Sequence, residues 1–155
     1  MDTNTVALQR EFVVDVLDEI KPLLEKHYEE IAWRKDKIHL DPNYEAYSLL
    51  ERRNMLFVFT ARFAGELVGY AVWMVSQNLH YKSVKAAKND IFYVEPTRRG
   101  AMIGKRLITF SEAELKKQGC NVISLHIKKS HNWQGLAEHL GYEHTELNMQ
   151  KWIGG

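Results

Sequence analysis

The stretch that decides the fold runs from Tyr93 to Ile108 and reads Tyr-Val-Glu-Pro-Thr-Arg-Arg-Gly-Ala-Met-Ile-Gly-Lys-Arg-Leu-Ile. Its apolar start, its proline and its glycines predict a strand that passes through a short loop directly into a helix. The first N–H groups of a helix have no intrahelical partner and carry a partial positive charge, so they attract anions. Basic residues and glycines surround this junction: Arg98, Arg99, Lys105 and Arg106, with Gly100 and Gly104. We therefore expect an anion of about the size of pyrophosphate to bind here.

Length and composition indicate one domain that covers residues 1–155. The chain has 155 residues, of which 45% are hydrophobic, enough for one buried core and too few for two ordinary domains. Lys and Arg together number 21 and Asp and Glu 20, so the net charge is +1. A near-neutral chain has no overall field that favours nucleic acid or a membrane, and we expect neither as a partner. The basic cluster is local, which favours a small anionic ligand.

The remaining global features predict a cytoplasmic protein. Cys120 is the single cysteine, so no internal disulfide can form. The N-terminal residues lack the basic and then apolar pattern of a signal peptide. No apolar run approaches the length that spans a bilayer.

Two helices are predicted in the first third of the chain. Apolar residues recur at steps of three and four between Val13 and Ile31, which indicates an amphipathic helix. Pro22 is expected to kink or divide it, because proline removes a backbone donor. Asp41 followed by Pro42 resembles a helix start, and this second helix is predicted to continue to about Arg53.

The middle of the chain predicts an antiparallel hairpin and a third strand. Met55–Phe63 and Leu67–Val75 are rich in β-branched and aromatic residues and flank Ala64-Gly65-Glu66. Gly69 inside the second segment indicates a bulge. Asp90–Val94 is predicted as the next strand, and the proline two residues later ends it.

In the last third of the chain, a helix follows the glycine loop. After it come a predicted strand, a short helix and a final strand. The first of these helices has an apolar stripe and ends at Gly119. Val122–Ile127 has the composition of a central, parallel strand. A short helix over residues 133–140 ends at Gly141, and Tyr142–Trp152 is predicted to return as the last strand. The fold class is therefore α/β, with a mixed sheet and one βαβ unit.

The order of these elements, with the loop at the third-strand junction, resembles the GNAT superfamily of N-acetyltransferases. The resemblance covers about residues 55–152. The family has a strand that ends in Val-x-Pro and a loop of the pattern Arg/Gln-x-x-Gly-x-Gly/Ala, and Val94-Glu95-Pro96 and Arg99–Gly104 fall on those positions. Met102 stands where the first glycine of the pattern is usual, so we expect a negative φ there and an altered approach to phosphate. Residues 37–44 also resemble, loosely, acetyltransferase-like proteins of tailed bacteriophages.

The resemblance implies a mostly antiparallel central sheet with helices on both faces, and transfer of an acetyl group from acetyl-CoA to a primary amine. The amine attacks directly in a ternary complex, without a covalent enzyme intermediate. The pyrophosphate would contact the N–H groups at the start of the helix, and the pantetheine chain would pair with the preceding strand. The positions implied for binding acetyl-CoA are Tyr93, Val94, Arg99, Gly100, Ala101, Met102, Ile103, Gly104 and Lys105.

The catalytic groups are less well indicated. An alkylammonium with a pKa of about 10.4 must lose a proton before it attacks, and Asp90 is the first candidate for the base. A solvated or hairpin-capping carboxylate is the other interpretation of this residue. The tyrosine that often acts as acid in this family is replaced by Ala137. Tyr142, His131 and His139 are candidates to replace it, or the thiolate leaves unassisted.

The acceptor side is predicted to involve Tyr44 and Tyr47 on the second helix, which corresponds to the variable substrate-side element of the family. The acceptor is a small-molecule or protein amine. The seven histidines have no metal-ligand spacing, so no metal is predicted. An exposed final strand could pair with a second copy and form a homodimer.

Two other functions compete with the enzyme. Because of the departures at Met102 and Ala137, the domain could instead be a catalytically weak or inactive module that binds CoA or a protein. Nucleic-acid binding through Lys128, Lys129 and the cluster at Arg98 is a poorer hypothesis, because the net charge is close to zero.

Overall fold

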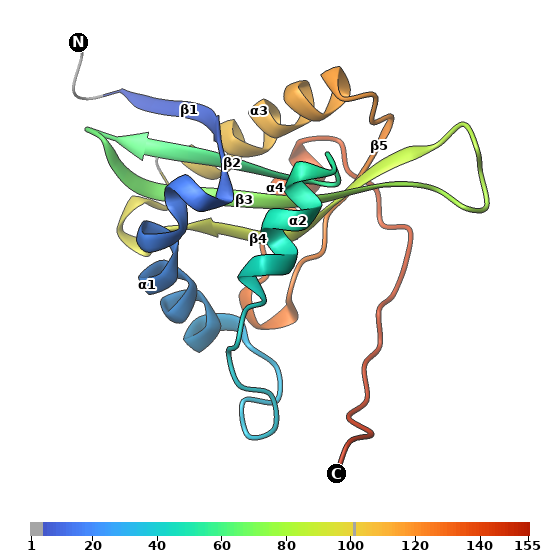
Figure 1. Cartoon of the computed structure of the whole chain (residues 1–155), viewed down its shortest axis with the longest axis horizontal. Helices are drawn as coiled ribbons and strands as arrows, with labels where there is room; N and C mark the ends of the chain where they lie inside the picture. Colours follow the sequence, from blue (N-terminus) through green and yellow to red (C-terminus); the bar gives the residue numbers. More distant parts are fainter. Residues whose placement is uncertain (1–4, 101) are drawn as a thin grey trace.

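A computed structural model describes residues 5–100 and 102–155. Within these residues, a five-stranded sheet has the order β1-β2-β3-β4-β5 (Figure 1). The strands are β1 (Val6–Glu11), β2 (Leu56–Phe63), β3 (Glu66–Gln77), β4 (Lys85–Val94) and β5 (Val122–Ser124). Neighbours from β1 to β4 are antiparallel, and β5 is parallel to β4. The predicted mixed, mostly antiparallel sheet is confirmed.

Helices cover both faces of the sheet, as predicted. They are α1 (Val13–Ile31), α2 (Tyr44–Arg52), α3 (Ile103–Lys117) and α4 (Gln134–His139), with 3-10 turns η1 (Pro96–Arg98) and η2 (Lys129–His131). Val16 and Ile20 of α1 pack against Tyr70 and other residues on one face of the sheet. Leu107 and Leu115 of α3 pack on the opposite face in a separate cluster. Because both faces are covered, β3 is buried over most of its length.

The predicted hairpin is present, and its turn explains its sequence. Ala64 and Gly65 both have positive φ, 49° and 83°, which is the geometry of the two-residue turns that match strand twist. The bulge near Gly69 is also present, because Ala61 pairs with Gly69 while the next residue of β2 pairs with Leu67. A side chain at Gly69 would lie 3.0 Å from the carbonyl of Tyr93 on β4. The glycine therefore allows β3 and β4 to pack closely where β4 ends.

The N-terminal part differs from the expectations at β1 and at the start of α2, and α1 continues past Pro22 without a break. Residues 6–11 form β1 at the sheet edge, where no element was predicted. Pro22 does not divide α1; it lies on the exposed face of the helix, where water can satisfy the carbonyl that proline leaves unpaired. The cap of α2 is Asn43, whose side chain accepts a hydrogen bond from the N–H of Ala46 at 3.0 Å. The helix thus begins after Asp41 and Pro42 rather than at them.

Expectations for the C-terminal part are partly wrong. The parallel strand is confirmed, but β5 is three residues long and lies at the edge of the sheet rather than in its centre. Residues 142–152, predicted as the last strand, belong to no strand in the described part of the chain. A strand requires a hydrogen-bonded neighbour, and this segment leaves the sheet instead of pairing with it.

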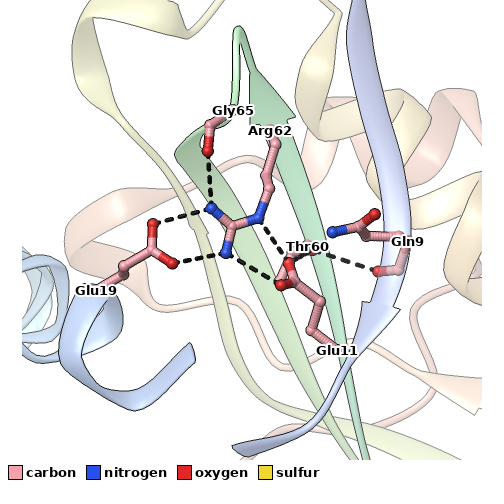
Figure 2. A network of polar contacts seen from close by, with 6 residues as sticks. All are labelled: Gln9, Glu11, Glu19, Thr60, Arg62 and Gly65. Atoms are coloured by element: carbon pink, nitrogen blue, oxygen red, sulfur yellow. Dashed lines mark hydrogen bonds and ion pairs between the residues drawn. The ribbon is translucent and has the colours of Figure 1, made fainter. Parts of the chain in front are cut away.

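A network of charged groups joins the first strand to the rest of the fold (Figure 2). Arg62 of β2 contacts Glu11 of β1 at 2.8 Å and Glu19 of α1 at 2.7 Å. The same guanidinium donates to the carbonyl of Gly65 at 2.9 Å, and the hydroxyl of Thr60 donates to Glu11. Arg62 therefore fixes β1, the β2–β3 turn and α1 relative to one another. We call this set the Arg62 clamp.

Candidate functional site

The loop between β4 and α3 has the backbone geometry of a glycine loop although it contains Met102. Gly100 has φ of 90° and Met102 has φ of 60°, and α3 begins at the next residue. The expectation of a negative φ at Met102 is therefore wrong. The side chain is 58% exposed, so it is accommodated without being buried. A left-handed backbone conformation destabilises a residue other than glycine by about 1–2 kcal/mol. The rest of the fold must offset this strain at Met102. The predicted contact at Ala101 lies outside the described residues.

The N-terminus of α3 is open to a ligand. The first helical hydrogen bond runs from the N–H of Arg106 to the carbonyl of Met102 at 3.0 Å. In residues 5–100 and 102–155, no side chain caps the helix, and no group accepts a hydrogen bond from the N–H of Ile103 or Gly104. A Cβ on Gly104 would be 3.5 Å from Phe92, so this face of the helix is directed toward β4.

The basic residues of the loop have different roles from those that the sequence suggested. The Nε of Arg99 donates to the carbonyl of Val94 at 2.9 Å, and its guanidinium pairs with Glu30 of α1 at 2.9 Å. Burial raises the pKa of Glu30, but the hydrogen bond and the charge of Arg99, with smaller contributions from neighbouring histidines, together outweigh burial and hold the pKa below its ordinary value. Arg99 thus joins the end of β4 to α1.

Lys105 is the basic residue that is placed to meet an anion. Arg98 stacks on the ring of Phe63 at 4.2 Å, and Arg106 donates to the carbonyl of Val6 at 3.1 Å. Lys105 is half-buried on the first turn of α3, and its side-chain ammonium has no hydrogen-bond or ion-pair partner among the described residues. Arg98 and Arg106 keep their positive charges, but of these three residues only Lys105 has a charged group without a hydrogen bond or ring contact in the described part of the chain.

β4 and β5 separate toward their C-terminal ends. They pair only over residues 86–88 and 122–124. Beyond that point the side chain of Asn89 replaces the ladder: its Nδ2 donates to the carbonyl of His126 at 3.1 Å, and its Oδ1 accepts from the N–H of His126 at 2.5 Å. Val72 of β3 pairs with Ile91 while Trp73 pairs with Asn89, so Asp90 is the extra residue of a β-bulge.

A cavity of about 250 Å³ lies where the strands separate. It is bounded by α1, by β4 and by the segment that follows β5. Its lining residues are His27, Ile31, Lys88, Asn89, Asp90, Phe92, His126, Lys128, His131 and Trp133. Phe92 and Trp133 form one wall, with ring centroids 4.7 Å apart. Since Phe92 also faces Gly104, the cavity and the start of α3 share this residue.

The structure brings Asp90 and Tyr47 together. The hydroxyl of Tyr47 on α2 donates to Oδ2 of Asp90 at 2.5 Å. Burial and this hydrogen bond raise the pKa of Tyr47, so it keeps its proton and remains a donor at neutral pH. Tyr44 lies apart from them, in a second hollow of about 440 Å³ with Glu45, Ser48 and Arg52.

The strand end that carries Tyr93 and Val94 is firmly held. Val94 pairs with Gly69 of β3, and both Tyr93 and Val94 are buried. The hydroxyl of Tyr93 donates to Glu95 at 3.0 Å. The other edge of β4 beyond Lys88 has no strand partner among the described residues, so it is open to an extended ligand.

Tyr142 is not part of this cavity. Its hydroxyl donates to Glu112 of α3 at 3.2 Å, and burial raises its pKa. Ala137 is buried on α4, and His139 is exposed at the end of that helix. Among the candidates for a general acid, only His131 lines the cavity. Its Nδ1 lies 3.3 Å from Oε1 of Glu30.

Sequence reasoning missed most of the cavity lining, including Asn89 and His27. Asn89 gives no pattern in the sequence, because its role depends on the point at which two strands separate. His27 does give a signal, since it occupies an apolar position of the α1 stripe. It is buried 5.3 Å from the ring of Tyr93, and burial lowers its pKa to about 4. At neutral pH it is therefore an uncharged imidazole in the wall of the cavity.

The described residues contain neither a metal-binding cluster nor a helix that could span a membrane. No three His, Cys, Asp or Glu side chains lie close enough to hold a metal ion in residues 5–100 and 102–155. In the same residues, no helix is both long and apolar enough to cross a membrane.

Comparison with known proteins identifies the family and the fold. The profile of the acetyltransferase (GNAT) family matches residues 16–142. No protein of curated function matches the sequence. A search of solved structures finds an aminoglycoside acetyltransferase from an uncultured soil metagenome, in complex with sisomicin, at a TM-score of 0.75 and 18% identity. That match covers 96% of this chain and 95% of the other.

Two further structures have the same fold. A ribosomal-protein-alanine N-acetyltransferase from Brucella melitensis has a TM-score of 0.70 and 18% identity, and the match covers 97% of this chain and 100% of the other. A predicted acetyltransferase from Clostridium acetobutylicum, crystallised with acetyl-CoA, has a TM-score of 0.72 and 14% identity. The match covers 96% of this chain and 97% of the other. At these identities the likeness establishes the fold.

Proposed function

The chain belongs to the acetyltransferase (GNAT) family, and we propose that it transfers an acetyl group from acetyl-CoA to a primary amine by direct attack in a ternary complex. The observation that carries this proposal is the position of Phe92: its ring lies 3.5 Å from where a Cβ on Gly104 would stand at the start of α3, and it also lines the cavity that contains Asp90. The proposed transfer requires a site for the diphosphate, a strand edge for the pantetheine chain and a carboxylate near the amine. The start of α3, the unpaired edge of β4 and Asp90 would supply them in that order.

The residues at the start of α3 fit a diphosphate. The N–H groups of Ile103 and Gly104 are directed at the ligand, and Lys105 adds a positive charge. Met102 keeps the left-handed backbone that lets the loop enter the helix. Arg99 acts indirectly, because its guanidinium holds the end of β4 against Glu30 of α1.

The edge of β4 beyond Lys88 is the proposed place for the pantetheine chain. Amide groups of that chain can pair with an unpaired strand edge as an added strand does. In this proposal, backbone N–H groups near the bulge at Asp90 would donate to the oxyanion that develops during attack. Acetyl-CoA supplies an activated acyl group, and the chain supplies position and hydrogen bonds.

Asp90 is the proposed base. An alkylammonium has a pKa of about 10.4 and must be deprotonated before attack. Asp90 protrudes from β4 at the bulge and lines the cavity, and Tyr47 holds its carboxylate in one orientation. His131 is the proposed donor to the leaving thiolate, since it lines the same cavity and Tyr142 does not.

The acceptor class is proposed from the same site and from the names of the structural relatives. One relative was crystallised with sisomicin, and another is a ribosomal-protein-alanine N-acetyltransferase. Both names point to amine acceptors, one a small molecule and one a protein. We propose a small-molecule or protein amine for this chain, which reaches Asp90 past Tyr47 of α2.

Turnover tests this proposal directly. The protein is incubated with acetyl-CoA and a panel of amines and amino-terminal peptides, and both the free thiol and the acetylated product are measured. We expect thiol release that depends on one class of amine and yields equimolar product. If no amine in a broad panel produces acetylated product, while acetyl-CoA still binds, the transferase proposal is wrong.

A module that binds CoA without transfer is the second candidate. It is favoured by one observation: buried Ala137 stands where the family often has an acid, and Tyr142 is engaged with Glu112. That function predicts a higher melting temperature with acetyl-CoA in the absence of turnover.

A further inference from the structure

The cavity between β4 and the segment that follows β5 has a basic lining. Its charged or titratable side chains are Lys88, Asp90, Lys128, His27, His126 and His131. Among the described residues that line the cavity, Asp90 is the only carboxylate. At neutral pH, two ammonium groups therefore face a cavity with one carboxylate. This excess of positive charge is local, because the net charge of the whole chain is +1.

The two lysines reach the cavity from different elements. Lys88 is the last residue of β4 that pairs with β5, and Lys128 directly precedes η2. Burial lowers the pKa of His126, and the charges of Lys88 and Lys128 lower it further. Both ammonium groups therefore act on the same part of the lining.

The chain does not neutralise these two charges. In residues 5–100 and 102–155, neither ammonium group has a hydrogen bond or an ion pair. The carboxylate of Glu30 on α1 lies 3.3 Å from the lining residue His131, but it is also paired with Arg99 at 2.9 Å. In the described part of the chain, Lys88 and Lys128 are thus available to an anionic group of a ligand.

Acidic residues are scarce around the cavity. Residues 67–89 and 115–137, which include most of β3 and β4, β5 and the segment after it, contain no Asp or Glu. Glu146 opposes the effect of the two lysines on the pKa of His126, but it is exposed and does not line the cavity. A negatively charged ligand group would therefore meet a positive potential here.

Acetyl-CoA does not account for this charge. Its diphosphate is proposed to bind at the start of α3, beside Lys105. Its pantetheine chain, proposed to lie along β4, is an uncharged chain of amides. The anion that Lys88 and Lys128 fit is therefore expected on the second substrate, the amine.

We propose that the acceptor is a small primary amine that also carries a carboxylate or phosphate, with its amine at Asp90 and its anion between Lys88 and Lys128. This inference rests on the proposed acetyl transfer and specifies its acceptor. Groups of opposite charge in one cavity orient such a molecule, because the reversed orientation would place like charges together. The lysines would thus direct the amine toward the proposed base.

The geometry limits the size of this acceptor. Lys88 and Asp90 are two residues apart on β4, which is at most roughly 7 Å along a strand. A molecule with a few bonds between its amine and its anion spans that distance. The cavity volume of about 250 Å³ also favours a small molecule.

Matched pairs of amines test the charge requirement. β-Alanine is compared with β-alaninamide, and O-phosphoethanolamine with ethanolamine. We expect kcat/KM for the anionic member to exceed that of its partner at least about 10-fold in one pair, and that pair identifies the anion as carboxylate or phosphate. An anion raises the pKa of a nearby ammonium and leaves less free amine, so this preference cannot come from reactivity.

Binding is measured separately from transfer. Calorimetry uses protein saturated with CoA, which has no acetyl group to donate, and the same four amines. The anionic member should again bind at least about 10-fold more tightly. Selective binding of anionic amines without any acetylation would contradict the transferase proposal and would support the charge requirement.

Lys88→Gln and Lys128→Gln should each lower kcat/KM for the anionic amine by about 10-fold. The Kd of acetyl-CoA, and kcat/KM for the amine without the anion, should not change. Lys129→Gln removes an adjacent exposed lysine that does not line the cavity, and it should behave as the wild type does. Melting temperatures show whether the variants remain folded.

Four results would overturn this assignment. They are equal binding of the two members in both pairs, no binding of either anionic amine at millimolar concentration, an unchanged preference in the Lys88 and Lys128 variants, or a weaker affinity of these variants for acetyl-CoA. The last result would mean that the two lysines bind the coenzyme rather than the acceptor.

Discussion

At the scale of single residues, Met102 shows how a departure from a family pattern can leave the backbone unchanged. Its φ of 60° is the value that a glycine would adopt without cost. The expected negative φ at Met102 depended on the premise that any side chain excludes a left-handed backbone. Neighbouring structure instead imposes it, and the exposed thioether side chain does not clash. Substitution patterns alone therefore do not predict whether such a loop remains a phosphate site.

Replacing Met102 with glycine should stabilise the protein by about 1 kcal/mol, because it removes the left-handed strain. Met102→Val should destabilise it, since a β-branched residue tolerates positive φ poorly. Urea denaturation monitored by circular dichroism measures both changes. Loss of stability in Met102→Gly would mean that the methionine side chain is itself needed.

Asp90→Asn removes the proposed base while it keeps the shape of the side chain. We expect kcat to fall by at least about 100-fold, with the Kd for acetyl-CoA unchanged. Asp41→Asn, in the exposed loop before α2, is the matched control and should have wild-type kinetics. An Asp90→Asn variant with normal kcat would leave the residue as a bulge carboxylate without a catalytic role.

Tyr47 is proposed as a positioning residue, because it acts through Asp90. Tyr47→Phe removes one hydrogen bond, so kcat should fall by about 10-fold. KM for acetyl-CoA should not change. A rise in that KM together with a lower melting temperature would instead indicate a general packing role.

His27 makes stability depend on pH. Its pKa is about 4 in the folded protein because burial disfavours the charged form, and about 6.5 when unfolded. Between these values the unfolded chain binds the extra proton, so stability falls by up to about 3 kcal/mol as pH decreases from 6.5 to 4. His27→Gln should flatten the dependence measured by urea denaturation, whereas His80→Gln, at an exposed position, should not. Equal slopes in the two variants would refute this.

At the scale of elements, the predictions succeeded where local chemistry decides the structure. The hairpin at Ala64-Gly65, the helix that ends at Gly119 and the bulge at Gly69 each depend on a turn or glycine requirement that neighbouring residues reveal. The prediction missed β1 because residues 6–11 become a strand only through their pairing with β2. The predicted final strand was wrong because a strand-like pattern also needs a pairing partner, and residues 142–152 leave the sheet instead of pairing with it.

The Arg62 clamp connects β1 to the rest of the fold, and its removal should destabilise the protein. Burial raises the pKa of Glu11, but hydrogen bonds from Arg62 and Thr60 outweigh it and lower the pKa. The Arg62 hydrogen bond likewise lowers the pKa of Glu19. Because both folded pKa values are depressed, this stabilisation is present at neutral pH and is lost as pH falls through them.

Arg62→Met should therefore lower the free energy of unfolding by about 2 kcal/mol at pH 7. The loss should become smaller below about pH 4, where the carboxylates of the unfolded chain take up protons before those of the folded protein do. Chemical denaturation at both pH values measures the difference. Arg53→Met, at an exposed position, is the control. A destabilisation that does not change with pH would mean that Arg62 acts through packing rather than charge.

At the scale of the whole molecule, the site lies where elements from distant parts of the sequence meet. α1 supplies His27, β4 supplies Asp90, and the segment after β5 supplies His126 and His131. The junction between β4 and α3 could be predicted because it is contiguous in sequence. The cavity could not, because it depends on how far β4 and β5 stay paired and on the bulge at Asp90.

Calorimetric titration of acetyl-CoA tests the central claim, that the open end of α3 and the separation of β4 and β5 form one binding site. We predict binding of one acetyl-CoA per chain with a Kd in the micromolar range. Gly104→Trp should abolish it, because an indole at this position would fill the space beside Phe92 and Leu136. Lys116→Trp, at the exposed far end of α3, should bind as the wild type does. Absence of binding to the wild type at millimolar acetyl-CoA, or equal binding by a folded Gly104→Trp variant, would contradict the account.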